Sequence, residues 1–359
     1  MVEYNPEYMN RAITLAKKAD AGVQPNPYVG AVVVQNDKII GEGYHKKFGE
    51  KHAEPIAIDN STESTEGADL YVTLEPCSHN GKTPPCVDKI IESKIRRVFI
   101  GMVDPYEKVS GRGIKILQNA GIKVVTGIKE KEVKELNKVF ITNIYEKRPF
   151  IYIKYAMTLD GYIATTSYNS KWISNELSRE NVHHKRHNVQ GILVGSNTVV
   201  KDNPRLTARL KDDGFQPTPV VLDFSGDISS LKYKIFNRKS ILITSNFNLK
   251  SNNNVKIFKI KKDESIEINN LGKLLCNENI HSVLVEGGAK TISYFLKNKF
   301  FDEINVYVSS KIIGRGLSPT AFGKVDEIKN GIELQKVEHF SFGDNIMIKG
   351  ARKSVHWID

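Results

Sequence analysis

Short runs of aliphatic and β-branched residues alternate with helical stretches along the chain, and this alternation limits the fold more than any other feature. The first 126 residues contain the runs VGAVVVQ, KIIGEGY, LYVTLEP, RRVFIG and IKVVTG. The first two runs meet at a turn formed by Asn36 and Asp37, and helical segments separate the later ones. Short apolar runs predict strands, and strands joined through helices predict a sheet that is at least partly parallel. This part of the chain is therefore expected to fold as an α/β sandwich.

The alternation stops and then begins again around residue 147. The segment KEKEVKELNKVFITNIYEK has helical spacing and ends before Arg148 and Pro149, because proline does not continue a helix. After it come FIYIKYAM, GILVG, PVVLD, SILIT, SVLVEGG and EINVYVS, with helices expected near residues 175–189 and 289–298. A chain of 359 residues also exceeds the usual size of one domain. We therefore predict two α/β domains, of residues 1–147 and 148–359.

Charge and hydropathy narrow the class of partner. The net charge of +11 comes from lysines scattered among acidic residues, as in GIKEKEVKELNKVF, rather than from a basic stripe. No apolar run approaches the roughly 20 residues that a membrane helix needs, and the first residues do not read as an export signal. We expect a soluble cytoplasmic protein that binds neither membranes nor nucleic acid.

Two of the three cysteines, Cys77 and Cys86, are separated by eight residues in the segment TLEPCSHNGKTPPC. A disulfide is not expected without export, which leaves metal binding or packing. His52 lies 25 residues before Cys77, in the tripeptide HAE at the expected start of a helix. One imidazole and two thiolates suit Zn²⁺ and leave a fourth tetrahedral position open for water, which is typical of a catalytic site. We therefore predict that His52, Cys77 and Cys86 bind a catalytic zinc ion.

Glu54 stands two residues from His52 and is expected to face the water of this site without binding the metal. Zinc lowers the pKa of a bound water toward about 7, and a carboxylate beside it can carry its proton to a leaving amine. Such a site hydrolyses an amino group from a ring carbon. The sequence therefore predicts hydrolytic deamination with Glu54 as the catalytic acid and base.

The segments QPNPYVGAVVV, HAE, TLEPCSHNGKTPPC and DPYEKVSGRG resemble the deaminase half of the bifunctional deaminase/reductase family of riboflavin biosynthesis. Cytidine and tRNA-adenosine deaminases typically have P-C-x-x-C, a shorter cysteine spacing. The resemblance implies a cytidine-deaminase-like α/β/α sandwich and assigns Asn26, His45 and Lys82 to the substrate. One departure is Ile56, which stands where the family usually has His or Asn, and we expect this change to affect substrate contact near the metal.

The second half contains KYAMTLDGYIA, SKWIS, GILVGSNTVVKDNPRLTAR and VLVEGGAKT, which together resemble the reductase half of the same family. The resemblance implies a dihydrofolate-reductase-like α/β domain that uses NADPH. Under this resemblance, eight residues stand at positions that contact the cofactor in the family: Ala156, Trp172, Thr198, Asp202, Gly288, Ala289, Lys290 and Thr291. Five further residues stand at positions that contact the substrate in the family: Ser170, Arg186, Leu206, Arg209 and Glu286. Lys154 lies in the motif beside them. Arg186 and Arg209 could hold a phosphate between them.

The resemblance implies a zinc-dependent pyrimidine deaminase in residues 1–147 and an NADPH-dependent reductase in residues 148–359. The first would convert 2,5-diamino-6-(5-phosphoribosylamino)pyrimidin-4-one to 5-amino-6-(5-phosphoribosylamino)uracil, and the second would reduce the ribosyl group to a ribityl chain. The expected partners are these small molecules, one zinc ion per chain, NADPH and further copies of the chain in a homo-oligomer. Two alternatives remain: a zinc deaminase of free or nucleic-acid bases with a C-terminal binding module, and a protein in which zinc is only structural.

Overall fold

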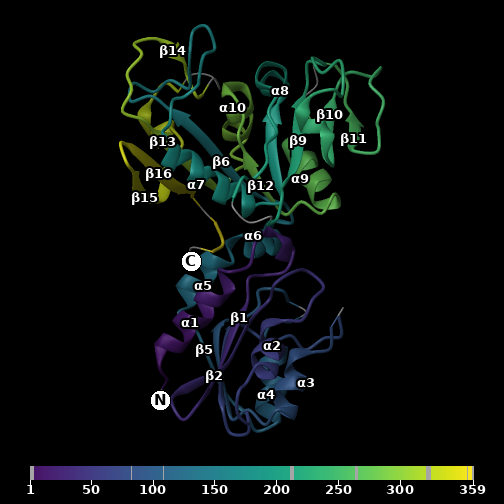
Figure 1. Cartoon of the computed structure of the whole chain (residues 1–359), viewed down its shortest axis with the longest axis vertical. Coiled ribbons are helices and arrows are strands. Elements are labelled where there is room, and N and C mark those ends of the chain that lie inside the picture. The colour runs from purple at the N-terminus through teal and green to yellow at the C-terminus, as the bar shows by residue number, and fades with distance from the viewer. Residues whose placement is uncertain are drawn as a thin grey trace. The chain divides into compact units, whose positions relative to one another are not determined.

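The computed structural model describes residues 4–81, 83–107, 109–210, 214–262, 266–320, 325–353 and 355–357 (Figure 1). The chain divides into two compact units, which are considered separately: Met1–Glu146 with His356–Asp359, and Lys147–Val355. The last described residues thus belong to the first unit, where the His356 ring stacks on Tyr145 at 4.8 Å and Trp357 is buried. Within the described part of the chain, no helix combines the length and apolar character needed to cross a bilayer.

The first unit is built on a sheet that, in the described residues, has the strand order β2-β1-β3-β4-β5. Its strands are β1 (Gly30–Gln35), β2 (Lys38–Tyr44), β3 (Asp69–Leu74), β4 (Arg97–Met102) and β5 (Lys123–Thr126). The pairs β1·β2 and β1·β3 are antiparallel, whereas β3·β4 and β4·β5 are parallel. This mixture confirms the partly parallel sheet expected from the sequence.

Helices cover both faces of this sheet, which makes the α/β/α sandwich (Figure 1). They are α1 (Pro6–Ala16), α2 (Ala53–Asp59), α3 (Cys86–Glu92), α4 (Arg112–Asn119), α5 (Glu130–Leu136) and α6 (Lys138–Glu146), with a 3₁₀ turn at Ala21–Val23. Asn5 caps α1 by accepting a hydrogen bond from the Glu7 N–H at 3.0 Å, and Pro6 occupies the first helical position, where its missing N–H matters least.

The segment 130–146 forms two helices and not the single helix that its spacing predicted. The break falls at Asn137, which is fully buried. Its side chain accepts from the Tyr28 N–H at 2.8 Å and donates to the Tyr28 carbonyl at 3.1 Å. This tertiary contact ends α5 where the local pattern would have allowed the helix to continue.

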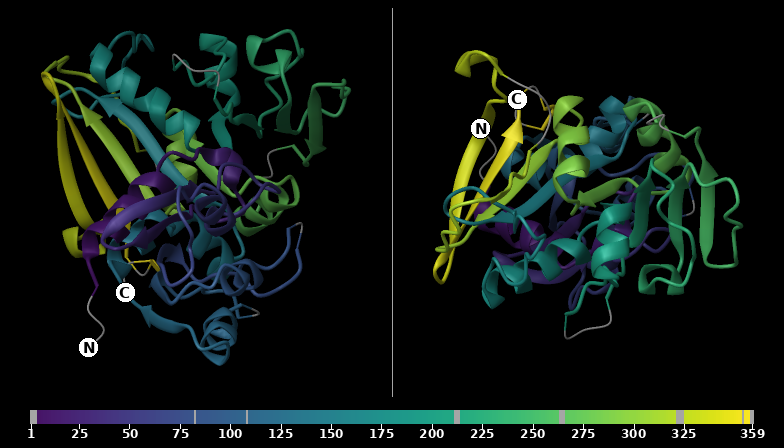
Figure 2. Two further views of the ribbon diagram at one scale, coloured as in Figure 1. Left: turned by 60° about the horizontal axis from the view of Figure 1, so that its bottom comes forward. Right: turned by 90° about the horizontal axis from the view of Figure 1, so that it is seen from above.

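The second unit contains a larger sheet with the strand order β11-β10-β9-β8-β12-β6-β13-β16-β15 in the described residues. The strands of this order run β6 (Phe150–Met157), β8 (Gly191–Gly195), β9 (Thr218–Asp223), β10 (Ser240–Thr244), β11 (Val255–Lys259), β12 (Ser282–Val285), β13 (Glu303–Val308), β15 (Leu334–Phe342) and β16 (Asn345–Arg352). Parallel pairing extends from β11 to β13, and β16 and β15 add an antiparallel edge. Figure 2 shows yellow β15 and β16 at one edge and green β10 and β11 at the other. A small separate pair joins β7 (Ala164–Thr165) to β14 (Gly316–Leu317).

The helices of this unit are α7 (Glu176–His187), α8 (Ser196–Asp202), α9 (Ile268–Asn277) and α10 (Ala289–Lys297), with 3₁₀ turns at Lys234–Asn237 and Ile328–Asn330. One apolar cluster joins the sheet to α9 and α10 through residues such as Leu271 and Phe295, both fully buried. A second cluster lies around Val199 of α8. Helix α9 and the β15–β16 hairpin are elements that the sequence reasoning missed.

Candidate active sites

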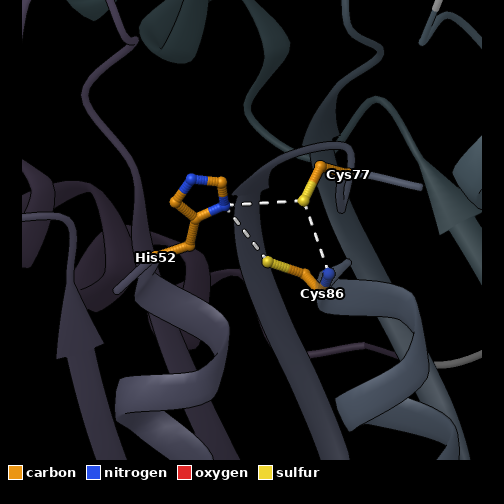
Figure 3. A group of neighbouring side chains, drawn as sticks. All are labelled: His52, Cys77 and Cys86. Atoms are coloured by element: carbon orange, nitrogen blue, oxygen red, sulfur yellow. Dashed lines mark hydrogen bonds between the residues drawn. The ribbon is translucent and has the colours of Figure 1, made fainter. Parts of the chain in front are cut away.

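The predicted zinc ligands come together in the first unit (Figure 3). The Nδ1 atom of His52 lies 3.3 Å from the Sγ atom of Cys86 and 3.5 Å from that of Cys77. His52 precedes the first turn of α2, Cys86 opens α3, and Cys77 follows β3. Among the described residues this is the one group of His, Cys, Asp and Glu side chains close enough together to hold a metal ion.

The donor set fits zinc in both kind and spacing. With bonds of about 2.1 Å to nitrogen and 2.3 Å to sulfur, a tetrahedral zinc site places its nitrogen and sulfur ligands about 3.6 Å apart. The two observed separations match this value closely. The pKa of the Cys77 thiol is lowered because Cys86 and His52 hydrogen-bond to its thiolate, and the Cys86 backbone N–H donates to the same sulfur at 3.4 Å. The site therefore favours the thiolate at Cys77, whereas the hydrogen bond to Cys77 and burial raise the pKa of Cys86.

Glu54 lies in the first turn of α2 and is almost completely buried beside these ligands. Burial, together with the charge of Cys77, raises the pKa of Glu54 to about 7, although the charge of His52 opposes the shift. A carboxyl group whose pKa lies near neutrality can both take and give a proton during one reaction cycle. The side chain thus has the protonation behaviour expected of a general acid and base.

A cavity of about 350 Å³ opens onto this group and is lined by His52, Cys77 and Glu54. Asn26 and His45, which the family resemblance assigned to the substrate, line the same cavity. The Nδ1 of His45 faces the Lys51 carbonyl at 3.0 Å, and its Nε2 faces the Asn26 amide nitrogen at 3.0 Å. If the His45 proton is on Nδ1, where it can be donated to the Lys51 carbonyl, then Nε2 accepts a hydrogen bond from the Asn26 amide. The oxygen and the second N–H of the Asn26 amide then remain for a ligand.

Glu75 supports the cavity wall, and the sequence analysis did not find it. It is buried and stands two residues before Cys77. A side chain on Gly113 would place its first carbon 2.1 Å from the Pro76 carbonyl oxygen, so the motif requires glycine there. The Glu75 carboxylate accepts hydrogen bonds of 3.0–3.4 Å from the backbone N–H groups of Asp104, Gly111, Gly113 and Ile114. The second half of the DPYEKVSGRG motif is thereby fixed behind the zinc ligands.

Two further sequence predictions have different outcomes. Ile56 does not line the cavity: its Cβ lies 2.8 Å from the place where a side chain on Gly43 would begin, so it packs against β2. This position argues against the expected effect on substrate contact, because residues two positions apart in a helix are rotated by about 200° and Ile56 therefore points away from Glu54. Lys82 lies outside the described residues.

In the second unit, most of the matched residues lie at the carboxyl edge of the parallel strands, where ligands of open α/β sheets bind. Lys154 and Ala156 share one face of β6, Thr198 and Asp202 belong to α8 after β8, and Glu286 follows β12. Gly288 precedes α10, and Ala289, Lys290 and Thr291 form its first turn. The strand order brings β6, β12 and β8 side by side.

The backbone around α10 leaves room for an anionic cofactor. Gly288 has no neighbour within 4 Å of the place where a side chain would begin, and no side chain caps the helix. Gly195 and Gly287 both face Thr291, because a side chain on either would begin 2.6 Å or less from a Thr291 atom. An uncapped helix start with glycines on either side fits the diphosphate of NADPH.

Arg186 and Glu286, both matched to substrate contacts, bind each other. The Arg186 Nε and Nη2 atoms donate to the two Glu286 oxygens at 2.7 and 2.8 Å. Burial alone would raise the pKa of Glu286, but attraction to Arg186 and Lys154 lowers it to about 2. Burial lowers the pKa of Lys154, although Glu286 opposes this effect. From the sequence we expected Arg186 and Arg209 to hold a phosphate between them. In the structure, Arg186 is instead paired with the Glu286 carboxylate.

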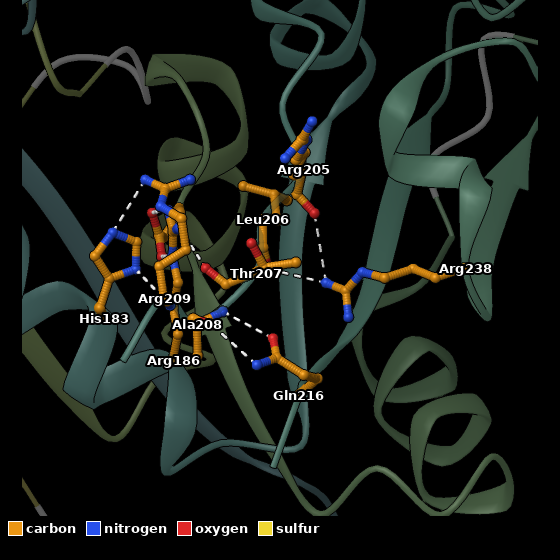
Figure 4. A network of polar contacts seen from close by, with 10 residues as sticks. His183, Arg186, Arg205, Leu206, Thr207, Ala208, Arg209, Gln216 and Arg238 are labelled. Carbon is orange, nitrogen blue, oxygen red and sulfur yellow. Dashed lines mark hydrogen bonds and ion pairs between the residues drawn. The ribbon is translucent and has the colours of Figure 1, made fainter. Parts of the chain in front are cut away.

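Arg209 lies against α7 and faces His183 (Figure 4). Its Nη2 is 3.0 Å from His183 Nε2, and its backbone N is 3.3 Å from Nδ1. Leu206 lies in the same segment and is buried. Ser170 and Trp172 are exposed, and within the described residues neither is hydrogen-bonded to Arg186, Arg209 or Glu286. The structure therefore brings four of the substrate positions together, those of Arg186, Leu206, Arg209 and Glu286.

Comparison with known proteins agrees with this architecture. A family described as "Cytidine and deoxycytidylate deaminase zinc-binding region" matches residues 3–102, and one described as "RibD C-terminal domain" matches residues 149–348. The riboflavin biosynthesis protein RibD of Aquifex aeolicus is 41% identical over 353 residues, which cover 96% of this chain and 98% of that protein. The protein of the same name from Bacillus amyloliquefaciens is 41% identical over 328 residues, covering 89% and 87% of the two chains.

Solved structures give the same result. The Thermotoga maritima diaminohydroxyphosphoribosylaminopyrimidine deaminase/5-amino-6-(5-phosphoribosylamino)uracil reductase is 42% identical, with a TM-score of 0.88 over 97% of this chain and 98% of that one. A structure of Acinetobacter baumannii RibD is 30% identical, with a TM-score of 0.88 over 97% and 99%.

Fold and site together define a two-part enzyme that joins a zinc-binding deaminase domain of the cytidine deaminase class to a reductase domain. The function expected from the sequence is confirmed. The chain belongs to the RibD family of bifunctional deaminases and reductases of riboflavin biosynthesis. Zinc and NADPH, the two cofactors expected from the sequence, are the cofactors of this family.

Proposed function

We propose that the first unit deaminates 2,5-diamino-6-(5-phosphoribosylamino)pyrimidin-4-one and that the second unit then reduces the ribosyl group of the uracil product. The observation that carries the first assignment is the burial of Glu54 beside a His52, Cys77 and Cys86 group with the spacing of a zinc site. The T. maritima protein, whose name states both activities, supports the choice of substrates.

In the deaminase, the chain's own groups hold the base and move the proton. Zinc, held by His52, Cys77 and Cys86, supplies a Lewis acid that makes water a better nucleophile. Asn26 pairs with the pyrimidine edge through the amide atoms that His45 leaves available. A Glu54 oxygen takes the proton from the attacking water and delivers it to the exocyclic amine nitrogen. Ammonia then leaves, the oxygen stays on the ring carbon as a carbonyl group, and the remaining proton of the water ends on the adjacent ring nitrogen.

In this scheme Glu75 acts indirectly, through the backbone, and Lys82 acts directly on the substrate. Glu75 holds residues 104 and 111–114 by their backbone N–H groups and so keeps the wall of the cavity in place. For Lys82, the family resemblance supports a contact with the phosphoribosyl part of the substrate, because a lysine can neutralise a phosphate.

In the reductase, the residues after the parallel strands divide into a cofactor group and a substrate group. NADPH supplies the hydride. The cofactor group holds its phosphates and nicotinamide and consists of Ala156, Trp172, Thr198, Asp202, Gly288, Ala289, Lys290 and Thr291. The substrate group consists of Lys154, Ser170, Arg186, Leu206, Arg209 and Glu286. Arg209 binds the substrate phosphate, while the Arg186–Glu286 pair holds hydroxyl groups of the opened sugar.

The opened sugar carries a C1′–N double bond, which accepts a hydride at C1′ and a proton at nitrogen. Lys154 is the group that best suits protonation of this nitrogen, because burial lowers its pKa and makes it a stronger proton donor, although the charge of Glu286 opposes this shift. Fixing the phosphate at one end would aim C1′ at the nicotinamide, which lowers the entropy cost of the reaction.

The test is to measure zinc per chain, ammonia release and NADPH oxidation for the wild-type protein and for Glu54→Ala. We expect Glu54→Ala to keep its zinc and lose about 10²- to 10⁴-fold in ammonia release. It should still oxidise NADPH when given the deaminated substrate. The matched control is Glu66→Ala, which removes an exposed carboxylate of the same unit. Zinc binding without either reaction would overturn the substrate assignment.

We also propose that the enzyme forms a homo-oligomer and works in the cytoplasm. None of its three cysteines forms a disulfide, which suits a reducing compartment. Strands β15 and β16 expose Phe340, Ile346 and Ile348 at the edge of the large sheet. Exposed apolar side chains on an edge hairpin are typical of an interface. Light scattering of the wild-type protein and of Phe340→Lys tests the oligomer, and a monomeric wild-type protein would exclude it.

A further inference from the structure

Residues 205–209, which we call the substrate loop, carry two of the proposed substrate contacts and are held by side chains from several parts of the second unit (Figure 4). Gln216 pairs with both backbone atoms of Ala208, accepting from its N–H at 3.0 Å and donating to its carbonyl at 2.9 Å. Arg186 donates to the Thr207 carbonyl at 3.1 Å. The loop is therefore tied to its surroundings through its backbone.

Leu206 has an uncommon backbone conformation within this loop. Its φ is +51°, in the left-handed region that bulky L-residues rarely adopt, and its side chain is buried. Such a conformation persists only where the surrounding contacts determine it, and it is common at ligand sites. The groups that hydrogen-bond to the backbone of Leu206 therefore hold the substrate loop in this conformation.

Arg238 supplies the contact at this position. Its Nη2 donates to the Leu206 carbonyl at 2.9 Å and lies 3.5 Å from the Arg205 carbonyl. Its Nη1 donates to the Pro217 carbonyl at 2.6 Å, just before β9. One guanidinium group thus joins the left-handed turn to the start of a central strand. A lysine has a single ammonium group and could not reproduce this planar two-sided contact.

The environment of Arg238 is unusual for a structural arginine. Within the described residues its hydrogen-bond partners are carbonyl groups and not carboxylates, and its Nε is buried without a partner. Burial, together with the nearby positive charge of Arg186, lowers the pKa of Arg238 to about 10. A partly buried cation that has no carboxylate partner among the described residues adds to the positive potential around Arg186 and favours an anionic ligand.

We propose that Arg238 is a positioning residue of the reductase, which holds the substrate loop, with the substrate position Leu206 in it, in the conformation that presents Arg209 to the phosphate of the substrate. This inference rests on the proposed function, which gives Leu206 and Arg209 their roles. Arg238 itself touches the loop backbone and the start of β9, and it acts on the substrate through the loop.

The test compares Arg238→Met and Arg238→Lys in the full-length zinc-loaded enzyme, using the reductase substrate with and without its 5′-phosphate. Loss of hydrogen bonds from a charged group corresponds to about a 10- to 100-fold change in an equilibrium. We expect the KM for the phosphorylated substrate to rise by about that factor in both variants. We expect unchanged KM for the dephosphorylated substrate, unchanged NADPH affinity by fluorescence, and unchanged ammonia release from the first unit.

A direct readout is the hydrogen–deuterium exchange of the peptide that contains the substrate loop. Exchange should accelerate in both Arg238 variants and stay slow in Lys259→Met. Lys259 is a matched control, because it is a cation that also donates to two loop carbonyls in this unit, those of Asn246 and Leu249. The Lys259 variant should keep the wild-type preference for the phosphorylated substrate.

Three outcomes would overturn the inference. Equal losses on both substrate forms would mean that Arg238 only stabilises the fold. Unchanged kinetics, or faster loop exchange without a change in KM, would mean that the loop needs no such support. If Arg238→Met fails to fold, Arg238→Lys carries the same comparison. The proposed function has its own control: if Arg209→Met leaves the phosphate preference of the wild-type enzyme unchanged, the phosphate assignment itself is wrong.

Discussion

The side chain of Asn137 forms a two-point contact with the backbone of Tyr28, through hydrogen bonds of 2.8 and 3.1 Å. The two residues are 109 positions apart, and the contact is made at the break between α5 and α6. Tyr28 lies two residues after Asn26, the residue proposed to bind the pyrimidine. A buried amide therefore fixes the segment that presents this residue to the cavity.

Replacing Asn137 by Ala should destabilise the first unit, because it leaves a buried N–H and a buried carbonyl of Tyr28 without partners. Such a loss costs about 1–3 kcal/mol. Thermal or denaturant unfolding measures it, and the deaminase KM should rise as Asn26 becomes less well fixed. The control is Asn10→Ala, an exposed amide, which should change stability by less than about 0.5 kcal/mol. Equal effects of the two substitutions would contradict the role given to Asn137.

Restoring a polar residue at position 56 should have little effect on deamination. Ile56 packs against β2 at Gly43 and does not line the cavity. We expect Ile56→Asn to change the deaminase kcat/KM by less than about 5-fold, which corresponds to about 1 kcal/mol. Steady-state ammonia release measures this value. A larger gain in rate would mean that residue 56 reaches the substrate after all.

Gly113→Ala should disturb the zinc site from a distance. The added methyl group would lie 2.1 Å from the Pro76 carbonyl oxygen, next to Cys77, so the backbone must shift. We expect weaker zinc retention against a chelator and lower deaminase activity, while NADPH oxidation persists. Gly67→Ala is the matched control, because Gly67 has a φ of +75° but no atom within 4 Å of its added carbon. It should show only the left-handed penalty, of about 1–2 kcal/mol, and keep its zinc.

His183 should remain neutral in the folded protein until the solution is strongly acidic. Burial and the charges of Arg186 and Arg209 lower the pKa of His183 to about 4, although Glu286 opposes them. Protonation of this histidine therefore favours the unfolded chain. Its effect on stability is absent above pH 6.5 and grows as the pH falls from 6.5 toward 4.

An NMR titration of the His183 ring in the folded protein measures this pKa directly. The His183→Gln variant should lose less stability than the wild type over the same pH interval. A phosphate bound beside Arg209 should raise the pKa of His183, because it offsets the positive charge nearby. A ring that titrates at its ordinary value in the folded protein would show that Arg186 and Arg209 do not act on it.

The zinc ligands and Glu54 could be predicted because their residue types have a definite chemistry and stand in two short segments. The residues that hold the sites in place could not. Asn137 and Arg238 act on backbone atoms 109 and 32 positions away, and a sequence carries no sign of a contact with a distant peptide group. The pairing of Arg186 with Glu286, 100 positions apart, was hidden for the same reason.

For the fold as well, some elements could be predicted from the sequence and others could not. Strands buried on both faces, such as Ala31 to Val34 of β1, read clearly as continuous apolar runs. The hairpin β15–β16 lies at a sheet edge, where polar and apolar side chains are both exposed, so its pattern was weak. The break at Asn137 was invisible, because only a tertiary contact distinguishes it from a residue within one long helix.

The return of His356 and Trp357 to the first unit makes the second unit, in topological terms, an insertion. The peptide chain crosses the boundary on entering residue 147 and again near residue 356. A gene fragment that stops at residue 146 would therefore encode a deaminase without the buried indole of Trp357. A protease that cuts only once, at residue 147, would break the chain in two, and the packing of His356 on Tyr145 and of the buried Trp357 would then be the hold of the second fragment on the first unit.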